Sequence, residues 1–508
     1  MKKALNQGVE SEGVPVAAGW DPPLESLMSP TLTQPERSPA TAERPDRSRS
    51  AYRTTPPRPG APRWWRDTAG ALTWISMLVV VTLWVSNGGL QGLTGTAGIL
   101  KGLGQLTGLV SADLLLIQVL MMARIPFVER AYGQDELAHR HRLVGFASFV
   151  LMLAHIGLIT VGYSIGSHTG VISQFVDMVL TYPGMLLALV GTGMLVLVVV
   201  TSIRAARSRL RRESWHLLHL YAYSGVALAL PHQLWTGGDF LASRAATVYW
   251  WTLWITAAVS IVQFRIGLPL VRSLRHRLVV ERVVAEAPGV VSVHVTGRRL
   301  NALPVRAGQF LNWRFLDGAG WTRANPYSLS AAPDGRGLRI TAKALGDGSA
   351  RLAGLRPGTR VLIEGPYGRL SGVARTRRRV VFMASGIGIT PMRAMLEEFS
   401  YRPGEATLLY RTGDLATTVF RAELDALAAA RGVHVGYLTG HRSPDPHSWL
   451  PAEAGAADPA AVLAHLAPAI AESDVFVCGP NPWMDAVARA ADRAGVPHDQ
   501  VHLERFDL

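Results

Sequence analysis

Six apolar segments, each long enough to cross the hydrocarbon core of a bilayer as a helix, occupy the first half of this 508-residue chain. They restrict the fold more than any other feature, because apolar helices of this length are stable only in a membrane or a large core. The composition agrees, since 48% of the residues are hydrophobic and only 17% are charged. The predicted spans are residues 70–87, 107–127, 143–163, 180–203, 215–235 and 247–267.

The positions of lysine and arginine predict the orientation of these spans. Thirteen such residues lie in alternate connections, at 124–142, 204–212 and 265–277. The opposite connections contain only Lys101 and Arg244. Because basic connections stay in the cytoplasm, we expect both termini on the cytoplasmic side of a plasma or inner membrane. The formal charge of +14 then reflects basic inner loops, and we expect no nucleic-acid partner.

The composition and the apolar pattern of the remaining sequence predict how the chain divides into domains. The first 62 residues hold eleven of the 31 prolines and no apolar period, which is typical of a disordered segment. After the last span, short alternating apolar runs predict a small antiparallel β-barrel, and from Arg379 strands alternate with helices, as in an α/β domain with a parallel sheet. The predicted domains are a disordered cytoplasmic segment (1–62), a six-helix transmembrane bundle (63–270), the β-barrel (271–374) and a nucleotide-binding α/β domain (375–508).

Four histidines inside two of the spans are the main chemical signal in the first half. His141 and His155 lie in the third span, and His219 and His232 lie in the fifth. Their separations correspond to about 21 Å and about 19.5 Å along a helix, against a core of about 30 Å. Because both spans run in the same direction, we expect inner and outer pairs, His141 with His219 and His155 with His232. A lone histidine would favour an interhelical hydrogen bond, but four at matched spacing favour two stacked bis-histidine haems.

The fifth span must be distorted for both of its histidines to face one way. Thirteen residues leave their directions about 140° apart, and Pro231 predicts the necessary kink. His139 and His216 lie among arginines at the cytoplasmic boundary, so we expect them to face headgroups or haem propionates. Without a CxxCH motif, the haems would be held non-covalently.

Asp113, in the second span, is a carboxylate at membrane depth, where such groups usually have a partner or a function. The predicted topology puts it toward the outer side. There it would shuttle protons or neighbour the outer haem, or else it would reach the outer headgroups, and the sequence leaves both interpretations open.

Two motifs in the predicted β-barrel suit a bound flavin. In Asn325–Ser330 (NPYSLS), the Tyr327 ring can lie against an isoalloxazine while Ser328 hydrogen-bonds to its polar edge. Gly346–Ser349 (GDGS) offers backbone amides and a hydroxyl to a pyrophosphate. Taken alone, that tetrapeptide is better explained as a hairpin turn.

The α/β region contains two loops that suit a pyridine nucleotide. Ser385–Pro391 (SGIGITP) follows an apolar strand and opens a helix at Pro391, and its glycines let phosphates approach the backbone. Cys478–Pro480 ends another apolar strand, and Phe506 lies near the C-terminus. Cys478 is the only cysteine, which excludes an internal disulfide and a four-cysteine metal site, so redox chemistry requires bound cofactors. A lone cysteine is also consistent with a simple core residue.

In this order, the matched histidines, NPYSLS, GDGS, SGIGITP, CGP and the near-terminal phenylalanine resemble the ferric reductase and NADPH oxidase superfamily over residues 70–508. That family joins a six-helix haem domain to a ferredoxin-reductase-like FAD and NAD(P)H module. The resemblance implies that the four histidines bind two b-type haems and that the β-barrel binds FAD. The implied catalytic residues are Tyr327, Ser328, Cys478 and Phe506. The implied cofactor-binding residues are Asn325, Pro326, Tyr327, Ser328, Leu329, Lys343, Gly348, Ser349, Gly386, Gly388, Thr390, Pro391, Arg411, Arg442, Cys478, Gly479, Pro480 and Phe506.

Two positions depart from the family pattern. Asn325 stands where the flavin motif often has Arg or His, so Arg323 would have to supply that contact. Ile159 stands one turn after the outer ligand, where oxygen-reducing oxidases commonly have a further histidine, which weakens the case for a dedicated superoxide generator. Arg411 and Arg442 can both meet a 2′-phosphate, so we expect NADPH as the donor, with NADH as the alternative.

The resemblance implies that reduced nicotinamide passes hydride to FAD in the cytoplasm, and that electrons then step from the inner to the outer haem. The expected acceptor outside is molecular oxygen or a ferric chelate. One alternative is an electron-transfer cytochrome that reduces a partner protein or a quinone. Another is a membrane-anchored flavin reductase whose histidines bind nothing.

Overall fold

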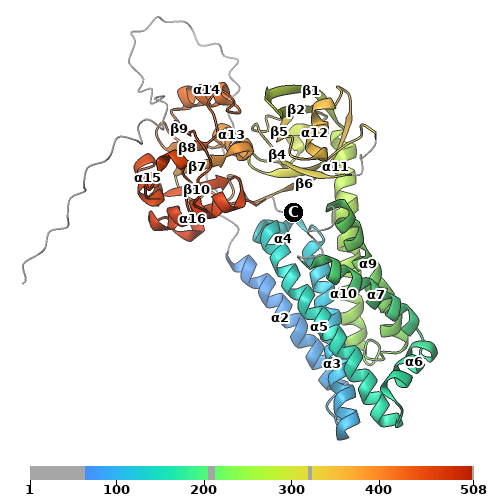
Figure 1. Ribbon diagram of the computed structural model, residues 1–508. Coiled ribbons are helices and arrows are strands. Elements are labelled where there is room, and N and C mark those ends of the chain that lie inside the picture. Colours follow the sequence, from blue (N-terminus) through green and yellow to red (C-terminus); the bar gives the residue numbers. More distant parts are fainter. Residues whose placement is uncertain (1–62, 204–211, 319–322, 506–508) are drawn as a thin grey trace, which may run out of the picture.

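A bundle of long helices followed by two sheets makes up the computed structural model, which describes residues 63–203, 212–318 and 323–505 (Figure 1). The predicted disordered segment at 1–62 and Phe506 lie outside the described residues. The helices of the first half are α2 (Arg63–Ser86), α3 (Gly95–Met122), α4 (Pro126–Tyr132), α5 (Gln134–Ser167), α6 (Val171–Thr181), α7 (Met185–Ser202), α9 (Arg212–Trp235), α10 (Arg244–Ser260), the π-helix η1 (Ile261–Gly267) and α11 (Leu268–His276).

Within the described ranges, five helical stretches are long and apolar enough to cross a membrane. They are Asp67–Ser86, Gly95–Met122, Glu136–Ser167, Met185–Ser202 and Arg244–His276. The fifth predicted span is also a helix, α9, but it is outside this set, and it opens with the polar sequence RESWH. Five of the six predicted crossings are therefore supported by length and composition, and the crossing at residues 215–235 stays a prediction.

The second span is longer than predicted, since α3 begins at Gly95 and not near residue 107. The glycines of this segment let α3 lie close against α5. A Cβ atom added at Gly104 would meet Ile159 at 2.8 Å, and one added at Gly108 would meet Nδ1 of His155 at 2.4 Å. Small residues at such crossings are common between membrane helices, because they bring the backbones together.

Asp113 is fully buried between three helices. Its Oδ1 atom accepts hydrogen bonds from the hydroxyls of Ser76 in α2 and Tyr249 in α10, both at 2.7 Å. Asp113 lies closer to the Met122 end of α3 than to its Gly95 end. Its burial contradicts the interpretation in which it reaches the outer headgroups, and its place toward the outer side stays a prediction.

The second part is the predicted antiparallel barrel. Its strand order is β4-β3-β6-β1-β2-β5, and a bridge between Leu329 and Ile340 connects the two edges. The barrel core includes Leu311, Trp313 and Ile340, each fully buried. The strands are β1 (Leu278–Ala287), β2 (Val290–Thr296), β3 (Phe310–Phe315), β4 (Asn325–Ser328), β5 (Gly337–Lys343) and β6 (Arg360–Tyr367). The predicted boundary at 270/271 falls inside α11, which ends at His276 just before β1.

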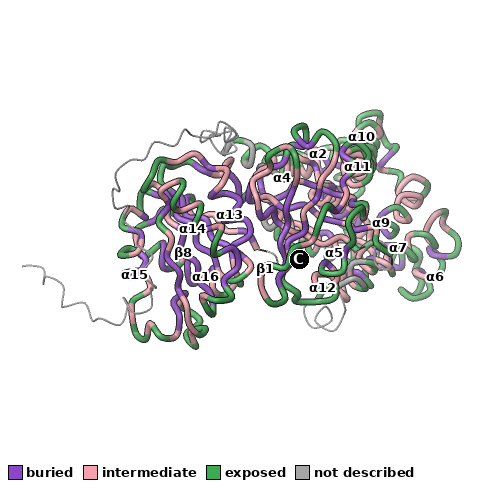
Figure 2. Tube along the Cα trace, turned by 90° about the horizontal axis from the view of Figure 1, so that it is seen from above, coloured by how far each residue is buried: buried purple, intermediate pink, exposed green. Residues whose placement is uncertain are grey.

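The third part is a parallel sheet with the order β11-β10-β7-β8-β9. Helices α13 (Ile389–Glu398) and α14 (Arg421–Arg431) pack on one face, and α15 (Pro459–Leu466) and α16 (Asn481–Arg493) pack on the other. The order reverses between β7 and β10, and dinucleotides bind at such a switch point in α/β sheets. Figure 2 shows the buried stretches of this domain between its outer helices. The strands are β7 (Arg379–Ser385), β8 (Ala406–Arg411), β9 (His434–Leu438), β10 (Ser473–Cys478) and β11 (Val501–Leu503).

Candidate functional site

The inner histidine pair, His141 and His219, comes from two helices, α5 and α9, and each of these helices packs along a different neighbour. α5 packs along α3, and α9 packs along α7. The rings of His141 and His219 have centroids 6.0 Å apart, at an interplanar angle of 66°. A metal bound by two imidazole nitrogens at about 2.0 Å each would hold the ring centroids about 6.4 Å apart. The centroid separation of the inner pair is therefore compatible with one metal bound between the two rings.

The outer pair has one ring already oriented by the backbone. Nδ1 of His155 lies 2.8 Å from the carbonyl oxygen of Gly104, so it donates there, and Nε2 is the nitrogen that could ligate a metal. His232 is close enough to His155 to interact with it electrostatically. α9 continues as a helix through Pro231. A Cβ atom added at Gly184 would lie 2.7 Å from the backbone nitrogen of His232. This close approach needs a glycine, whose φ of +80° is also in the left-handed region.

Of the remaining histidines in the membrane half, the two whose side chains are described do not join these pairs. His139 is exposed, and His168 is exposed at the end of α5. The side chain of His216 lies outside the described residues. The described part of the chain contains no group of three or more His, Cys, Asp or Glu residues suited to a metal ion. Two histidines can hold a metal ion where another group, such as a porphyrin, supplies the remaining ligands.

The NPYS segment forms β4, which pairs with β3 on the barrel wall. Ser328 is 6% exposed, and its Oγ atom has no hydrogen-bond partner among the described residues. Buried hydroxyls are normally satisfied, so an orphan of this kind marks a place where a ligand atom fits. The neighbouring Tyr327 is half-buried, and burial raises the pKa of its hydroxyl to about 12. These residues fit the polar edge and the face of a flavin.

The GDGS turn lies directly beside the NPYS segment. A Cβ atom at Gly348 would lie 3.0 Å from Oδ1 of Asn325, so the two predicted flavin motifs come together. The Ser349 hydroxyl accepts from the amides of Leu345 and Gly346 and closes its own turn. Glycine at 348 keeps the space above Asn325 open, which is what a phosphate approaching the backbone requires.

The two nucleotide loops touch each other at the switch point. A Cβ atom at Gly388 would lie 2.2 Å from the carbonyl oxygen of Cys478, and one at Gly479 would lie 2.9 Å from Cβ of Ser385. Only glycine allows this approach. Gly386–Gly388 forms a short 3₁₀ turn, and α13 begins at Ile389, so Thr390 and Pro391 lie in its first turn and not before it.

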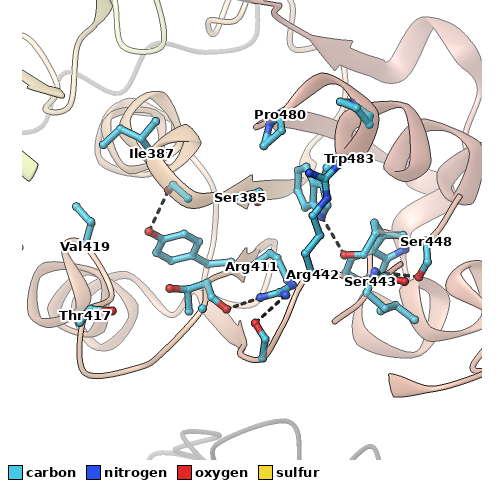
Figure 3. Close-up of a pocket in the computed structure, with 18 of the residues that line it drawn as sticks. Ser385, Ile387, Arg411, Thr417, Val419, Arg442, Ser443, Ser448, Pro480 and Trp483 are labelled. Carbon is cyan, nitrogen blue, oxygen red and sulfur yellow. Dashed lines mark hydrogen bonds between the residues drawn. The ribbon is translucent and has the colours of Figure 1, made fainter. Parts of the chain in front are cut away.

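A cavity of about 670 Å³ opens beside these loops (Figure 3). Its lining includes Lys343, Ser385, Gly386, Arg411, Arg442 and Pro480. The guanidinium of Arg411 donates to the carbonyls of Leu438, Gly440 and His441 at 3.3, 2.9 and 2.6 Å, and the side chain is 8% exposed. Arg442 is exposed at the rim. Arg411 therefore holds the β8 and β9 loops together, and Arg442 is the arginine left to meet a phosphate.

Cys478 and Glu504 interact electrostatically. The sequence motifs indicated Cys478 but not Glu504. Burial, with a smaller contribution from the Glu504 carboxylate, raises the pKa of the Cys478 thiol, so it stays neutral at pH 7. Glu504 is buried beside Gly368, where an added Cβ atom would meet its Oε1 at 2.4 Å. Sequence reasoning missed Glu504, although an acidic residue two places before Phe506 was visible. Phe506 itself lies outside the described residues.

Two family models match the two halves of this arrangement. Residues 107–230 match the ferric reductase like transmembrane component, and residues 382–489 match the oxidoreductase NAD-binding domain. The first range contains His141, His155 and His219, and His232 lies two residues beyond it. The second contains the SGIGITP and CGP loops.

Similar proteins cover only part of this chain. The ferredoxin reductase component of 3-ketosteroid-9-alpha-monooxygenase from Mycolicibacterium smegmatis is 32% identical over 205 residues, which is 39% of this chain and 55% of that protein. Ferredoxin–NADP reductase B from Sorangium cellulosum is 32% identical over 225 residues, which is 40% of this chain and 85% of that protein. The FAD/NAD-binding domain of nitric oxide dioxygenase from Vibrio cholerae is 25% identical, with a TM-score of 0.37, over 46% of this chain and 99% of that one. The chain thus spans about half the length of the first of these relatives.

Proposed function

Because the chain belongs to the ferric reductase and NADPH oxidase superfamily, with a ferric reductase-like transmembrane component joined to a ferredoxin-reductase-type module, we propose that it carries electrons from NADPH through FAD and two haems to an acceptor outside. The observation that carries the proposal is the inner histidine pair, whose ring centroids are 6.0 Å apart within the range matched by the transmembrane family model. When bound, the flavin would convert hydride transfer into single-electron transfer, and the haems would carry those electrons across the membrane.

The proposal assigns a separate task to each part of the chain. The β-barrel (278–367) binds FAD, with Tyr327 against the ring and Ser328 at its polar edge. The α/β domain (379–503) holds the nicotinamide beside Cys478 and the phosphates at Gly386–Gly388. Both termini lie in the cytoplasm and the protein is a multi-pass component of the plasma or inner membrane, as the basic inner connections support.

The acceptor we propose is molecular oxygen or a ferric chelate. The absence of a histidine at Ile159 favours the chelate over oxygen. A partner protein is the second candidate, because both curated relatives described above carry ferredoxin in their names. These candidates differ in what reoxidises the protein.

The test is an absorption spectrum of the detergent-purified protein, reduced by NADPH without oxygen and then divided between air and ferric citrate. Bleaching of the flavin followed by reduced bis-histidine haem bands is the expected result, and the addition that restores the oxidised spectrum within turnover time names the acceptor class. A reduced haem that neither addition reoxidises would favour a partner protein or a quinone. A preparation with no haem band would overturn the proposal in favour of a membrane-anchored flavin reductase.

Arg442 is the residue we propose for selecting NADPH. An Arg442→Ala variant is expected to raise KM for NADPH about ten-fold, because one charge-assisted contact to the 2′-phosphate is lost. KM for NADH should stay within about two-fold. Steady-state kinetics with both nucleotides measure this, with Arg421→Ala as the control, since that arginine pairs with Asp425 on the surface of α14. Equal changes for both nucleotides would contradict the assignment.

A further inference from the structure

The flavin-binding barrel meets the membrane helices at the end of α3, where Arg124 occupies a constrained position. The C-terminus of α3 is fixed by Arg265 of η1, whose Nε and NH2 atoms donate to the Met122 carbonyl at 3.0 and 2.9 Å. Arg124 follows with a φ of 65°, a left-handed conformation that non-glycine residues adopt only when their surroundings impose it. Its side chain is 10% exposed. The sequence counted Arg124 only as one basic residue of the 124–142 connection, whereas the structure packs it inside a junction.

Arg124 joins residues of the membrane half to residues of the barrel. On the membrane side, NH1 donates to Oε1 of Glu129 in α4 at 2.7 Å and also to the Gln134 side chain at the start of α5. On the barrel side, Nε lies 3.9 Å from Glu364, and the guanidinium lies over the Tyr367 ring at 4.2 Å. One planar cation thus contacts α4, α5 and β6 together, which a flexible lysine cannot reproduce.

The carboxylates around Arg124 depend on its charge. Glu364 has a side chain 8% exposed, and Glu129 one 13% exposed, and the two repel each other. Burial raises the pKa of the Tyr367 hydroxyl, which remains protonated and donates to Oε1 of Glu364 at 2.8 Å. Without Arg124, the two acids would lose their shared cation. They would keep only Arg314, 3.8 Å from Oε2 of Glu364, and Arg265, which interacts with Glu129, so their repulsion would favour separation of the barrel from the helices.

The same residues form a packed connection between the flavin site and the inner histidine. Ser328, Phe310 and Tyr367 are register partners across β4, β3 and β6, so their side chains lie on one face of the sheet. The rings of Phe310 and Tyr367 have centroids 5.8 Å apart. On the other side of Arg124, Gln134 begins the helix that reaches His141 after seven residues, a rise of about 10.5 Å.

The barrel also meets the helices at Gly133, where an added Cβ atom would lie 2.8 Å from Cδ of Arg369. Further contacts come from the segment that is covalently continuous with the barrel. The Ser273 hydroxyl of α11 accepts from the Ile363 amide at 3.2 Å, and Arg272 donates to the Gly365 carbonyl. These contacts tether β6 to its own linker helix. The contacts that the barrel makes toward α4 and α5 include those of Arg124 and of Gly133.

We propose that Arg124 is a positioning residue that docks the flavin-binding barrel on the cytoplasmic ends of α4 and α5 and thereby sets the rate of electron transfer from the flavin site to the inner histidine pair. The inference rests on the proposed function, because it concerns the step between the two cofactor sites. It adds a residue that contacts neither cofactor site directly.

The test compares Arg124→Ala with wild type in the full-length, cofactor-loaded protein by anaerobic stopped-flow absorption. Flavin reduction by NADPH is expected to stay within two-fold, while haem reduction slows at least ten-fold. Arg124→Lys should recover part of the rate of haem reduction. Lysine keeps the positive charge but lacks the planar guanidinium that contacts Glu129, Gln134 and the Tyr367 ring. Arg378→Ala is the matched control, because it removes an Arg–Glu pair on the nucleotide domain, where the arginine is 64% exposed; it should leave both rates unchanged.

Hydrogen exchange gives a readout independent of turnover. Backbone amides of α4 (126–132) and β6 (360–367) are expected to exchange faster in Arg124→Ala and not in Arg378→Ala. Unchanged haem reduction with unchanged exchange would overturn the inference, and so would equal slowing of both steps, which marks a general loss of structure. A wild-type protein without haem would instead overturn the proposed function, and the exchange comparison would still decide whether Arg124 docks the barrel.

Discussion

We expect a His141→Ala variant to reduce its flavin with NADPH at the wild-type rate and to lose electron delivery to any outer acceptor by more than about 100-fold. The reason is that changes to residues supporting a metal ligand typically cost 10- to 100-fold, and removing the ligand itself removes the inner site. His141 faces His219 across a 6.0 Å centroid separation with no other histidine of the described residues in that pair. Stopped-flow absorption at flavin and haem wavelengths measures both steps in one experiment.

A His155→Ala variant separates the two sites. It removes the ring that the Gly104 carbonyl orients, so the outer haem should be lost while the inner haem is still reduced by NADPH. The two variants are therefore expected to retain about half of the haem absorbance each, but only His155→Ala should show NADPH-dependent haem reduction. His139→Ala is the control, because this exposed histidine lies two residues before His141 on the same helix. Full haem content in both ligand variants would contradict the assignment.

The parts of this structure that the sequence predicts best are those set by local patterns. The strands of the α/β domain are short apolar runs bounded by turn residues, and β7, β8 and β10 lie where those runs predict them. The β-barrel follows from the same period, and its closure through Leu329 and Ile340 agrees with the predicted fold. The transmembrane helices follow from length and composition.

Contacts between distant segments are where sequence reasoning failed. The close packing of α3 against α5 at Gly104 and Gly108 was not predicted, because it joins segments that are distant in the chain. Asp113 is buried through hydrogen bonds with Ser76 and Tyr249, which are distant in the chain, so no local pattern indicates this contact. Arg411 was expected at a phosphate, but its guanidinium turns back to the carbonyls of neighbouring loops. Arg124 and Tyr367 are too far apart in the chain for any local pattern to connect them.

A Ser328→Ala variant is expected to bind FAD normally and to slow flavin reduction by NADPH about 100-fold, as removal of one preorganised hydrogen-bond donor typically does. The buried Oγ atom has no partner among the described residues, so the protein keeps a polar group there at a cost to its own stability. Folding should therefore be as stable or slightly more stable in the variant without flavin. Anaerobic stopped-flow reduction and thermal unfolding with and without FAD measure the two effects.

Ser330→Ala is the matched control for this prediction. It removes a hydroxyl two residues further along the same segment, and that hydroxyl already has hydrogen-bond partners within the protein. The Ser330 hydroxyl accepts from Thr341 at 2.7 Å and from Arg339 at 3.2 Å, inside the barrel core. Its loss should destabilise the fold by about 1–2 kcal/mol and leave the flavin reduction rate unchanged. Ser328→Thr, which keeps the hydroxyl, should restore much of the rate. If Ser328→Ala instead lowered stability like Ser330→Ala and kept its rate, Ser328 would be a structural residue and the flavin edge would lie elsewhere on the barrel.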